Sequence, residues 1–185
     1  VLYQGAEGPA MSVAQMQRMR PRILTLLALL LSGCSSGRQA CVLRDVTSVV
    51  YSQSSGAILP ELQWRETYTI ARSGVRLERR GAISGTLVNE GQWDAIPDPA
   101  GIELLFSQLE GLDCSTLQRL EPEDSPDGGG NSGYEVHYGT NQVLALLYEP
   151  GVTYRGDAPI TGAVDRLIES LVLPAQAIPQ HTEGQ

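Results

Sequence analysis

The chain has 185 residues, and its 21 acidic residues outnumber its 13 lysines and arginines, which gives a formal net charge of −8. An acidic chain without a basic patch cannot neutralise phosphates, so we expect no nucleic-acid partner. Two histidines and three cysteines, with no paired metal-ligand spacing, also argue against a zinc site.

Near the start of the chain, residues 18–34 have the composition of an export signal. Three arginines at positions 18, 20 and 22 precede an uncharged, mostly apolar run over residues 23–31. At about 1.5 Å per residue, a helix of this length covers about half of a roughly 30 Å hydrocarbon core, so it is short for a membrane span. A basic region, a short apolar run and small residues are typical of a secretory signal peptide. A short membrane anchor or a buried helix is the alternative interpretation.

This segment closes with Leu31, Ser32, Gly33 and Cys34, which resemble the lipobox of a bacterial lipoprotein. The resemblance implies that Cys34 is lipidated, becomes the first mature residue and anchors the chain to a membrane, which two or more acyl chains do firmly. Ser35 replaces the aspartate that resembles an inner-membrane retention signal. We therefore expect a lipid-anchored cell-envelope protein. It would lie on the outer membrane facing the periplasm in a two-membrane bacterium, and otherwise on the outer face of the cell membrane.

These signals divide the chain into four parts. Residues 1–33 comprise upstream residues and the signal peptide, 34–45 the lipidated cysteine and a tether, 46–173 a single domain, and 174–185 a flexible tail. Residues 34–185 are numerous enough for one domain with its own core. They carry ten arginines, no lysine and twenty acidic residues. This balance suits a protein that is held off an anionic surface or that faces a basic partner.

Cys41 and Cys114 remain once Cys34 serves as the anchor. Two such cysteines in an oxidising compartment predict a disulfide. Two unpaired thiols are the alternative, because the sequence does not give the distance between them.

The first half of the domain predicts strands. Residues 46–52 are rich in β-branched side chains and predict a strand, and residues 54–60 predict the loop after it. Alternating apolar and polar residues over 62–70 and 75–78, around a turn at 72–74, predict an antiparallel hairpin whose apolar face is interrupted by Glu66. Residues 86–88 predict a short fourth strand or a loop.

A helix follows, opened by Asp98 at the N-cap and Pro99 at the first position, and closed by Gly111. Residues 121–133 form an acidic, glycine-rich loop, residues 134–148 a second hairpin with its turn at 139–141, and residues 159–172 a second amphipathic helix that Pro174 ends. This order predicts an α+β fold, an antiparallel sheet of about four to six strands with two amphipathic helices packed on one face. The expected helix residues of the core are Ile102, Leu105, Phe106, Leu109, Val164, Leu167, Ile168 and Leu171.

Catalytic patterns are sparse. Residues 34–185 contain no Gly-x-Ser-x-Gly motif, and His137 falls on the polar face of its strand, which favours a solvated side chain over a general base. The acidic residues of 121–133 do not follow the spacing of the twelve-residue calcium loop, so a solvated turn is favoured over a calcium site. We therefore expect no enzyme activity, no cofactor and no metal.

Several short motifs resemble a family of small bacterial domains. They are Val50–Gly56, Tyr68–Ile70 with the turn at 72–74, Pro126–Gly128 and Tyr134–Gly139, followed by the closing amphipathic helix. The family is emfourin-like. Emfourin is a proteinaceous inhibitor of a thermolysin-type metalloprotease, and many of its relatives are uncharacterised lipoproteins. The resemblance implies the α+β fold over about residues 46–172 and a protease-inhibitor-like role.

Together these features predict a monomeric, lipid-anchored extracytoplasmic binding domain whose protein partner is a protease or an envelope complex. An envelope structural or assembly-factor lipoprotein is the alternative function, and an enzyme is the third. We expect the two loops that border the strands to lie at one end of the sheet and to form the interaction surface. The candidate contact residues in these loops are Ser54, Ser55, Gly56, Glu123, Asp124, Asp127 and Asn131.

Overall fold

The computed structural model describes residues 41–56, 59–81, 90–124, 126 and 128–178. The signal segment, the lipobox residues Leu31, Ser32 and Gly33, and Cys34 lie outside the described residues. So do the possible strand at 86–88, Asp127, and the last part of the expected tail.

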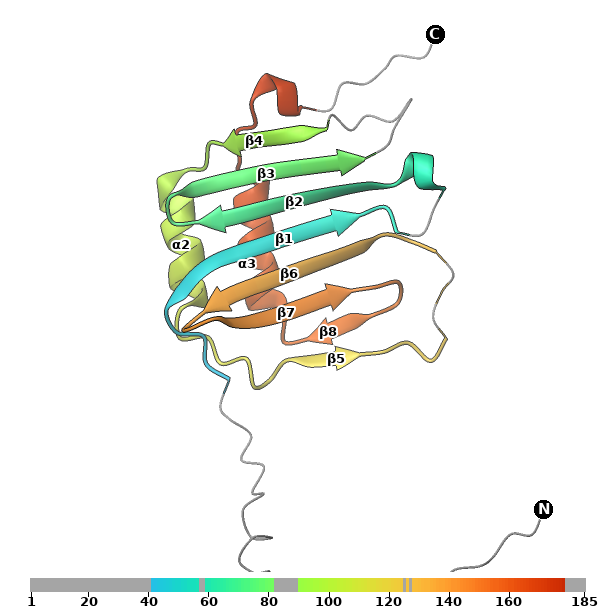
Figure 1. The fold of residues 1–185 in the computed structure, drawn as a ribbon. Helices are drawn as coiled ribbons and strands as arrows, with labels where there is room; N and C mark the ends of the chain where they lie inside the picture. Colours follow the sequence, from blue (N-terminus) through green and yellow to red (C-terminus); the bar gives the residue numbers. More distant parts are fainter. Residues whose placement is uncertain (1–40, 57–58, 82–89, 125, 127, 179–185) are drawn as a thin grey trace, which may run out of the picture. The chain divides into compact units, whose positions relative to one another are not determined.

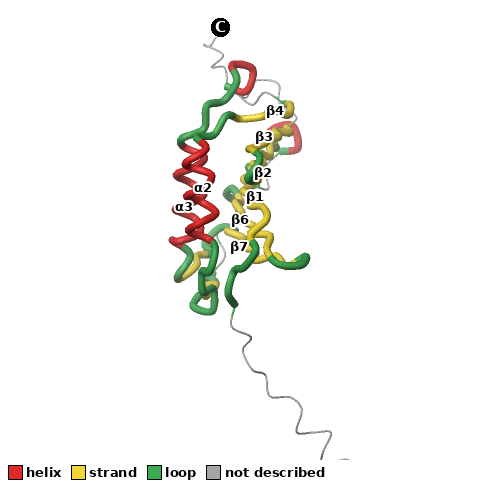
Figure 2. The backbone as a smooth tube through the Cα atoms, turned by 90° about the vertical axis from the view of Figure 1, so that its left-hand side faces the viewer, coloured by secondary structure: helices red, strands yellow, loops and turns green. Residues whose placement is uncertain are grey.

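The described part of the chain forms two layers. One layer is a six-stranded antiparallel sheet in the order β4-β3-β2-β1-β6-β7, and the other contains α2 (Pro99–Leu109) and α3 (Ala158–Glu169) on one face of that sheet (Figures 1 and 2). A separate two-stranded sheet pairs β5 with β8. This architecture confirms the expected α+β fold. The strands are β1 (Val46–Ser54), β2 (Trp64–Ala71), β3 (Gly74–Gly81), β4 (Gly91–Ala95), β5 (Gln118–Leu120), β6 (Asn131–Tyr138), β7 (Gln142–Tyr148) and β8 (Thr153–Arg155).

Alternation along the strands determines which side chains face the helices. Strand β1 is central and pairs with both β2 and β6, so that Val49 lies between Ile70 and Val136. These three side chains are buried against the helices, whereas the alternate residues lie on a face that the helices do not cover. The two hairpins, β2-β3 and β6-β7, are paired as their patterns predict.

The helices lie where the sequence places them. Asp98 caps α2 by accepting a hydrogen bond from the backbone N–H of Ala100, and Gly111 follows the helix with φ of +79°. Helix α3 ends three residues before the predicted 172, because Val172 instead forms a backbone bridge with Ile96. Six of the eight expected core residues are buried, and Ile168 and Leu171 are half-buried against the same core.

The expected tether at 34–45 is in fact packed against the domain from Cys41 onward. Cys41 and Cys114 form the expected disulfide, with their Cα atoms 5.0 Å apart. Leu43 is fully buried and exchanges backbone hydrogen bonds with residues 111 and 112. The carboxylate of Glu110 accepts the N–H groups of residues 45 and 46, at 2.9 and 3.2 Å, and these bonds hold the pKa of Glu110 below its ordinary value.

Other boundaries also differ from the sequence prediction. Strands β4, β5 and β8 are too short to show a clear period, and Leu62, expected to begin a strand, lies in a 3₁₀ turn (Pro60–Leu62). Residues 175–177, expected in a flexible tail, form another 3₁₀ turn in which Ala177 is buried. The acidic loop ends at residue 130, because Asn131 already belongs to β6.

Polar side chains occupy the core-facing side of the sheet near the ends of β1 and β2. Glu66, which interrupts the apolar face of its strand, forms a buried ion pair with Arg79. The amide of Gln53 donates to Glu66 at 3.1 Å, and Arg79 also donates to the carbonyl oxygen of Ala177. This network explains how the sheet buries two charges, because each is paired and hydrogen-bonded.

A row of tyrosine rings continues this polar region toward β7. The rings of Tyr51 and Tyr134 lie 4.9 Å apart, and the hydroxyl of Tyr134 donates to Asp165 on α3 at 2.8 Å. Burial, followed by this hydrogen bond, raises the pKa of Tyr134, so the hydroxyl keeps its proton. Tyr148 makes a second link by donating to Asp157 at the start of α3. These bonds tie the sheet to the helix layer.

Candidate functional site at the loop end of the sheet

The two predicted interaction segments meet at one end of the sheet. Ser54 and Asn131 are Cα partners at the ends of β1 and β6, so both are strand residues rather than loop residues. Gly56, with φ of +74°, lies so close to the next loop that an added Cβ would be 1.7 Å from the carbonyl oxygen of Gly129. Only glycine fits there, and the close backbone approach fixes one loop against the other. We call this region the loop end.

A cavity of about 530 Å³ opens at the loop end. Four of the predicted contact residues line it, namely Ser54, Ser55, Gly56 and Asn131. A second hollow of about 220 Å³ lies beside it. Ser54, Arg65 and Asn131 line both spaces, so Arg65 lies between them. The remaining residues around the larger cavity are Pro60, Gln63, Trp64, Arg80, Gly81 and Glu90.

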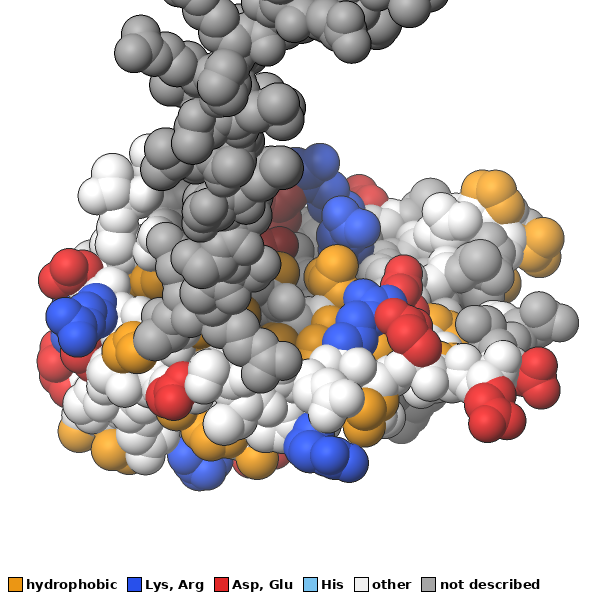
Figure 3. All heavy atoms as spheres, turned by 90° about the horizontal axis from the view of Figure 1, so that it is seen from below, with side chains coloured by type: hydrophobic (Ala, Val, Ile, Leu, Met, Phe, Trp, Pro, Cys, Tyr) orange, Lys and Arg blue, Asp and Glu red, His pale blue; other side chains and the backbone are white. Residues whose placement is uncertain are grey.

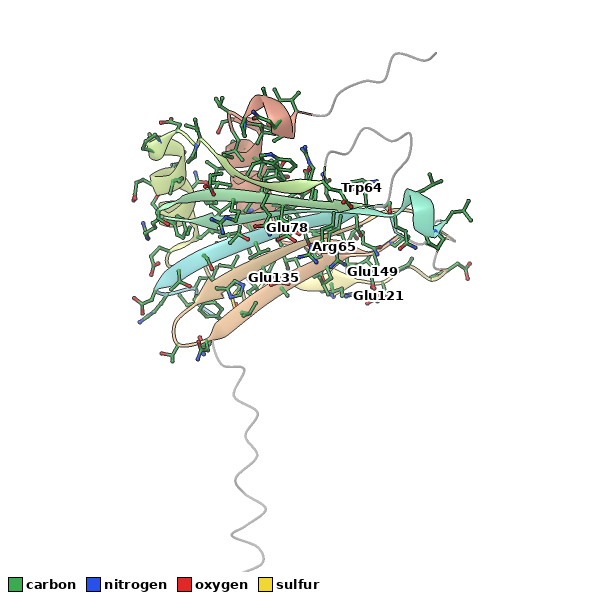
Figure 4. The ribbon with its side chains drawn as sticks, turned by 45° about the horizontal axis from the view of Figure 1, so that its top comes forward. Trp64, Arg65, Glu78, Glu121, Glu135 and Glu149 are labelled. Atoms are coloured by element: carbon green, nitrogen blue, oxygen red, sulfur yellow. A yellow bond between two sulfur atoms is a disulfide. The ribbon has the colours of Figure 1, made fainter. Side chains whose placement is uncertain are left out.

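Arg65 lacks an ion-pair partner among the residues that the structure describes. It is the direct cross-strand partner of Arg80, and like charges in that position repel each other. Arg80 forms an ion pair with Glu78, whereas Arg65 has no ion pair or hydrogen bond among the described residues. The carboxylate of Glu90 is held at the cavity by the backbone N–H of Gly81 at 2.7 Å. Figure 4 labels Arg65 at the start of β2 and Glu149, and both residues line the smaller hollow.

The acidic loop contributes less than expected. Glu123 and Asp124 are exposed and do not line either space at the loop end, and Asp127 lies outside the described residues. Near the start of the loop, Arg119 donates to Glu121 at 2.5 Å and to Glu149 at 2.6 Å, and these bonds raise its pKa further. Seen from the side of β5 and β7, acidic and basic side chains are therefore mixed rather than gathered into separate patches (Figure 3).

The opposite end of the sheet has a larger hollow, about 770 Å³, beside Arg72 and Arg76. Arg72 is 3.2 Å from Glu103 and Arg76 is 3.3 Å from Asp94, so both charges are compensated. The loop end is therefore the better candidate for a charged ligand.

His137 lies on the open sheet face, as its strand pattern predicts. Its Nε2 atom is 3.5 Å from the carboxylate of Glu135, and the two side chains are 36% and 45% exposed. Such exposure gives neither the desolvation nor the enclosed site that general-base catalysis uses. Within the described residues, no group of three or more histidine, cysteine or acidic side chains could hold a metal ion.

The sequence pattern does not distinguish Arg65 or Arg80 from other polar residues. Arg65 appears as an ordinary polar residue of the predicted hairpin, whereas Arg80 lies beyond its predicted second strand at 75–78. Only the observed strand register places the two arginines directly opposite each other. The turn at residues 72–74 pairs Ala71 with Gly74, and counting outward from that pair along both strands would have placed Arg65 opposite Arg80.

Comparisons of the chain with protein-family models, with curated proteins and with solved structures gave no match. None of the helices in the described ranges is long and apolar enough to cross a membrane.

Proposed function

We propose that this chain is a non-catalytic, lipid-anchored binding module of the bacterial cell envelope that contacts a protein partner through the loop end. The observation that carries the proposal is the close approach of the two loops at Gly56 and Gly129, beside a cavity lined by an arginine that has no ion pair among the described residues. Binding residues are commonly placed on loops that a rigid scaffold positions. The Cys41–Cys114 disulfide supports an extracytoplasmic location, because such bonds persist in oxidising compartments.

The anchor is tested by intact-mass spectrometry of the protein expressed with its own signal. We expect the mass of residues 34–185 plus acyl groups, and we expect Cys34→Ala to abolish both cleavage and acylation. An uncleaved and unlipidated wild-type chain would refute the anchor. The lipidated protein would also be expected on the periplasmic side of an outer membrane, which separation of the two membranes would check.

The contact surface is tested with two matched substitutions on β1. Ser54 lines the loop-end cavity, whereas Ser48 lies on the same open face at the other end of the strand, opposite Ala71 and His137. We expect Ser54→Tyr to fill the cavity and to abolish capture of the partner by the anchored protein. Ser48→Tyr should leave capture intact. Equal capture by both variants would contradict the proposed surface.

The sharpest version of the proposal is protease inhibition, which the emfourin-like motifs suggest. Purified protein would be titrated against a thermolysin-type metalloprotease, with the two tyrosine variants as the comparison. Dose-dependent inhibition that Ser54→Tyr abolishes would support this version. Absence of inhibition at high micromolar excess would discard it, and recovery of an envelope complex in the capture experiment would favour the assembly-factor alternative.

A further inference from the structure

Arg65 is an arginine of the loop end for which no ion pair is found among the described residues. Arg65 and Arg80 face each other on adjacent strands of the open sheet face, where their repulsion destabilises the pair unless an anion lies near them. The carboxylate of Glu78 serves Arg80. No described carboxylate serves Arg65, although the folded domain is strongly acidic.

The side chain of Glu61, which follows the cavity residue Pro60 in the sequence, lies outside the described part of the chain. The two undescribed segments next to cavity residues in the sequence carry no carboxylate. Residues 57–58 are Ala-Ile, and residues 82–89 are Ala-Ile-Ser-Gly-Thr-Leu-Val-Asn, so neither contains an acidic side chain. The carboxylate of Glu90 on the wall of the larger cavity already accepts a hydrogen bond from Gly81, and that of Glu149 beside the smaller hollow is paired with Arg119.

The neighbours of Arg65 are suited to a carboxylate ligand. A guanidinium presents parallel N–H donors that match the two oxygens of a carboxylate. Ser54 on β1 is the cross-strand partner of Arg65, and Asn131 on β6 is the partner of Ser54. The hydroxyl of Ser54 and the amide of Asn131 can both donate hydrogen bonds. All three line both hollows, so a side chain reaching into either space meets the same donors.

We infer that the loop end binds an acidic segment of a protein partner, with one aspartate or glutamate carboxylate held by Arg65, Ser54 and Asn131. This inference rests on the proposed function and names the chemistry of the partner. The rest of the domain is acidic and repels an acidic segment. The loop end is therefore the place where such a segment can approach. Arg80 adds a second positive charge at the cavity wall.

The test uses the full chain purified in detergent and a hexaglutamate peptide, with hexaglutamine as the neutral control. Trp64 lines the cavity, and the Trp93→Phe background leaves it as the only tryptophan, so its fluorescence reports occupancy. In that background we expect saturable binding of hexaglutamate, weakened by salt, and none of hexaglutamine.

Arg65→Gln should weaken binding about tenfold or more, because it removes a charge-assisted pair. Arg65→Lys should recover only part of the affinity, because lysine lacks the two parallel donors. The matched control is Arg76→Gln, an arginine on the same open face that is already paired with Asp94, and we expect less than about a twofold change.

Equal binding of the two peptides, or unchanged affinity in Arg65→Gln, would overturn the inference. Inorganic sulfate that binds as tightly as hexaglutamate would assign the site to a free anion and would likewise overturn it. The partner-capture experiment separates this outcome from the proposed function. If Ser54→Tyr abolishes capture while hexaglutamate fails to bind, the contact surface stands and the carboxylate assignment falls.

Discussion

The buried ion pair between Glu66 and Arg79 gives a prediction whose magnitude follows from its surroundings. The two residues are only 8% and 6% exposed. Glu66 also accepts from Gln53, and the guanidinium of Arg79 lies 5.9 Å from the ring centre of Trp93 and donates to Ala177. Neither charge can be rehydrated without opening the sheet or displacing the C-terminal turn.

Replacing one residue of the ion pair should therefore lower the free energy of unfolding strongly, whereas replacing both should lower it little. Arg79→Met leaves the Glu66 carboxylate buried with neutral donors only, and we expect a loss of about 3–5 kcal/mol in the free energy of unfolding. The double variant Glu66→Met, Arg79→Met removes both charges and should lie within about 1–2 kcal/mol of wild type.

Urea unfolding measures these differences. With a slope of about 2 kcal/mol per molar urea, the single substitution should lower the midpoint by roughly 1.5–2.5 M. The double variant should recover most of that shift. Additive losses in the two single variants and the double variant would show that the pair is not coupled and would refute the reasoning. A loss below about 1 kcal/mol in Arg79→Met would show that water reaches the pair.

Four further predictions concern other parts of the fold. Replacing Cys41 and Cys114 with serine removes a cross-link between residues 73 positions apart. Urea unfolding should show a loss of about 2–4 kcal/mol in the free energy of unfolding. An unchanged midpoint would show that the unfolded chain gains no conformational freedom. Phe106 is fully buried, so Phe106→Ala should cost about 3–5 kcal/mol by the same measurement. Because the pKa of Glu110 is lowered, the folded state prefers its ionised form. The stability advantage of wild type over Glu110→Gln should therefore be present above pH 4.5 and should disappear as pH falls below it. An advantage that persists in acid would show that the hydrogen bonds from residues 45 and 46 do not lower this pKa. Gly56→Ala would force the two loops apart, and we expect a loss of about 1–3 kcal/mol in thermal unfolding together with weaker hexaglutamate binding.

The periodic signals of the chain predicted the elements that packing reinforces most strongly. Helix α2 combines a capping aspartate, a proline at its first position and an apolar stripe, and each of these features favours the same helix independently. The two hairpins alternate in step with the burial of their side chains, so period alone identifies both the strands and their inward faces. The Cys41–Cys114 pairing was predicted from the two cysteines that remain if Cys34 is the anchor, and the structure contains that disulfide.

Other features depend on contacts between residues far apart in the sequence. Strands β5 and β8 have three residues each and pair across the intervening hairpin, so their local sequence carries too little period to distinguish them from loop. Leu43 and Ala177 belong to segments that look like tether and tail, yet both are buried once the sheet and helices provide surfaces for them.

The candidate site shows the same division. Local turn chemistry marked Ser54–Gly56 as a loop after a strand, and the acidic, glycine-rich composition marked the second loop. The cross-strand register of β2 and β3 then set Arg65 opposite Arg80, and the pairing of β1 with β6 set Ser54 beside Asn131. Sequence alone determined which residues are polar and lie near strand ends, because turns and alternation are local. Only the tertiary structure decided which of them share a cavity, because strand pairing joins residues more than seventy positions apart.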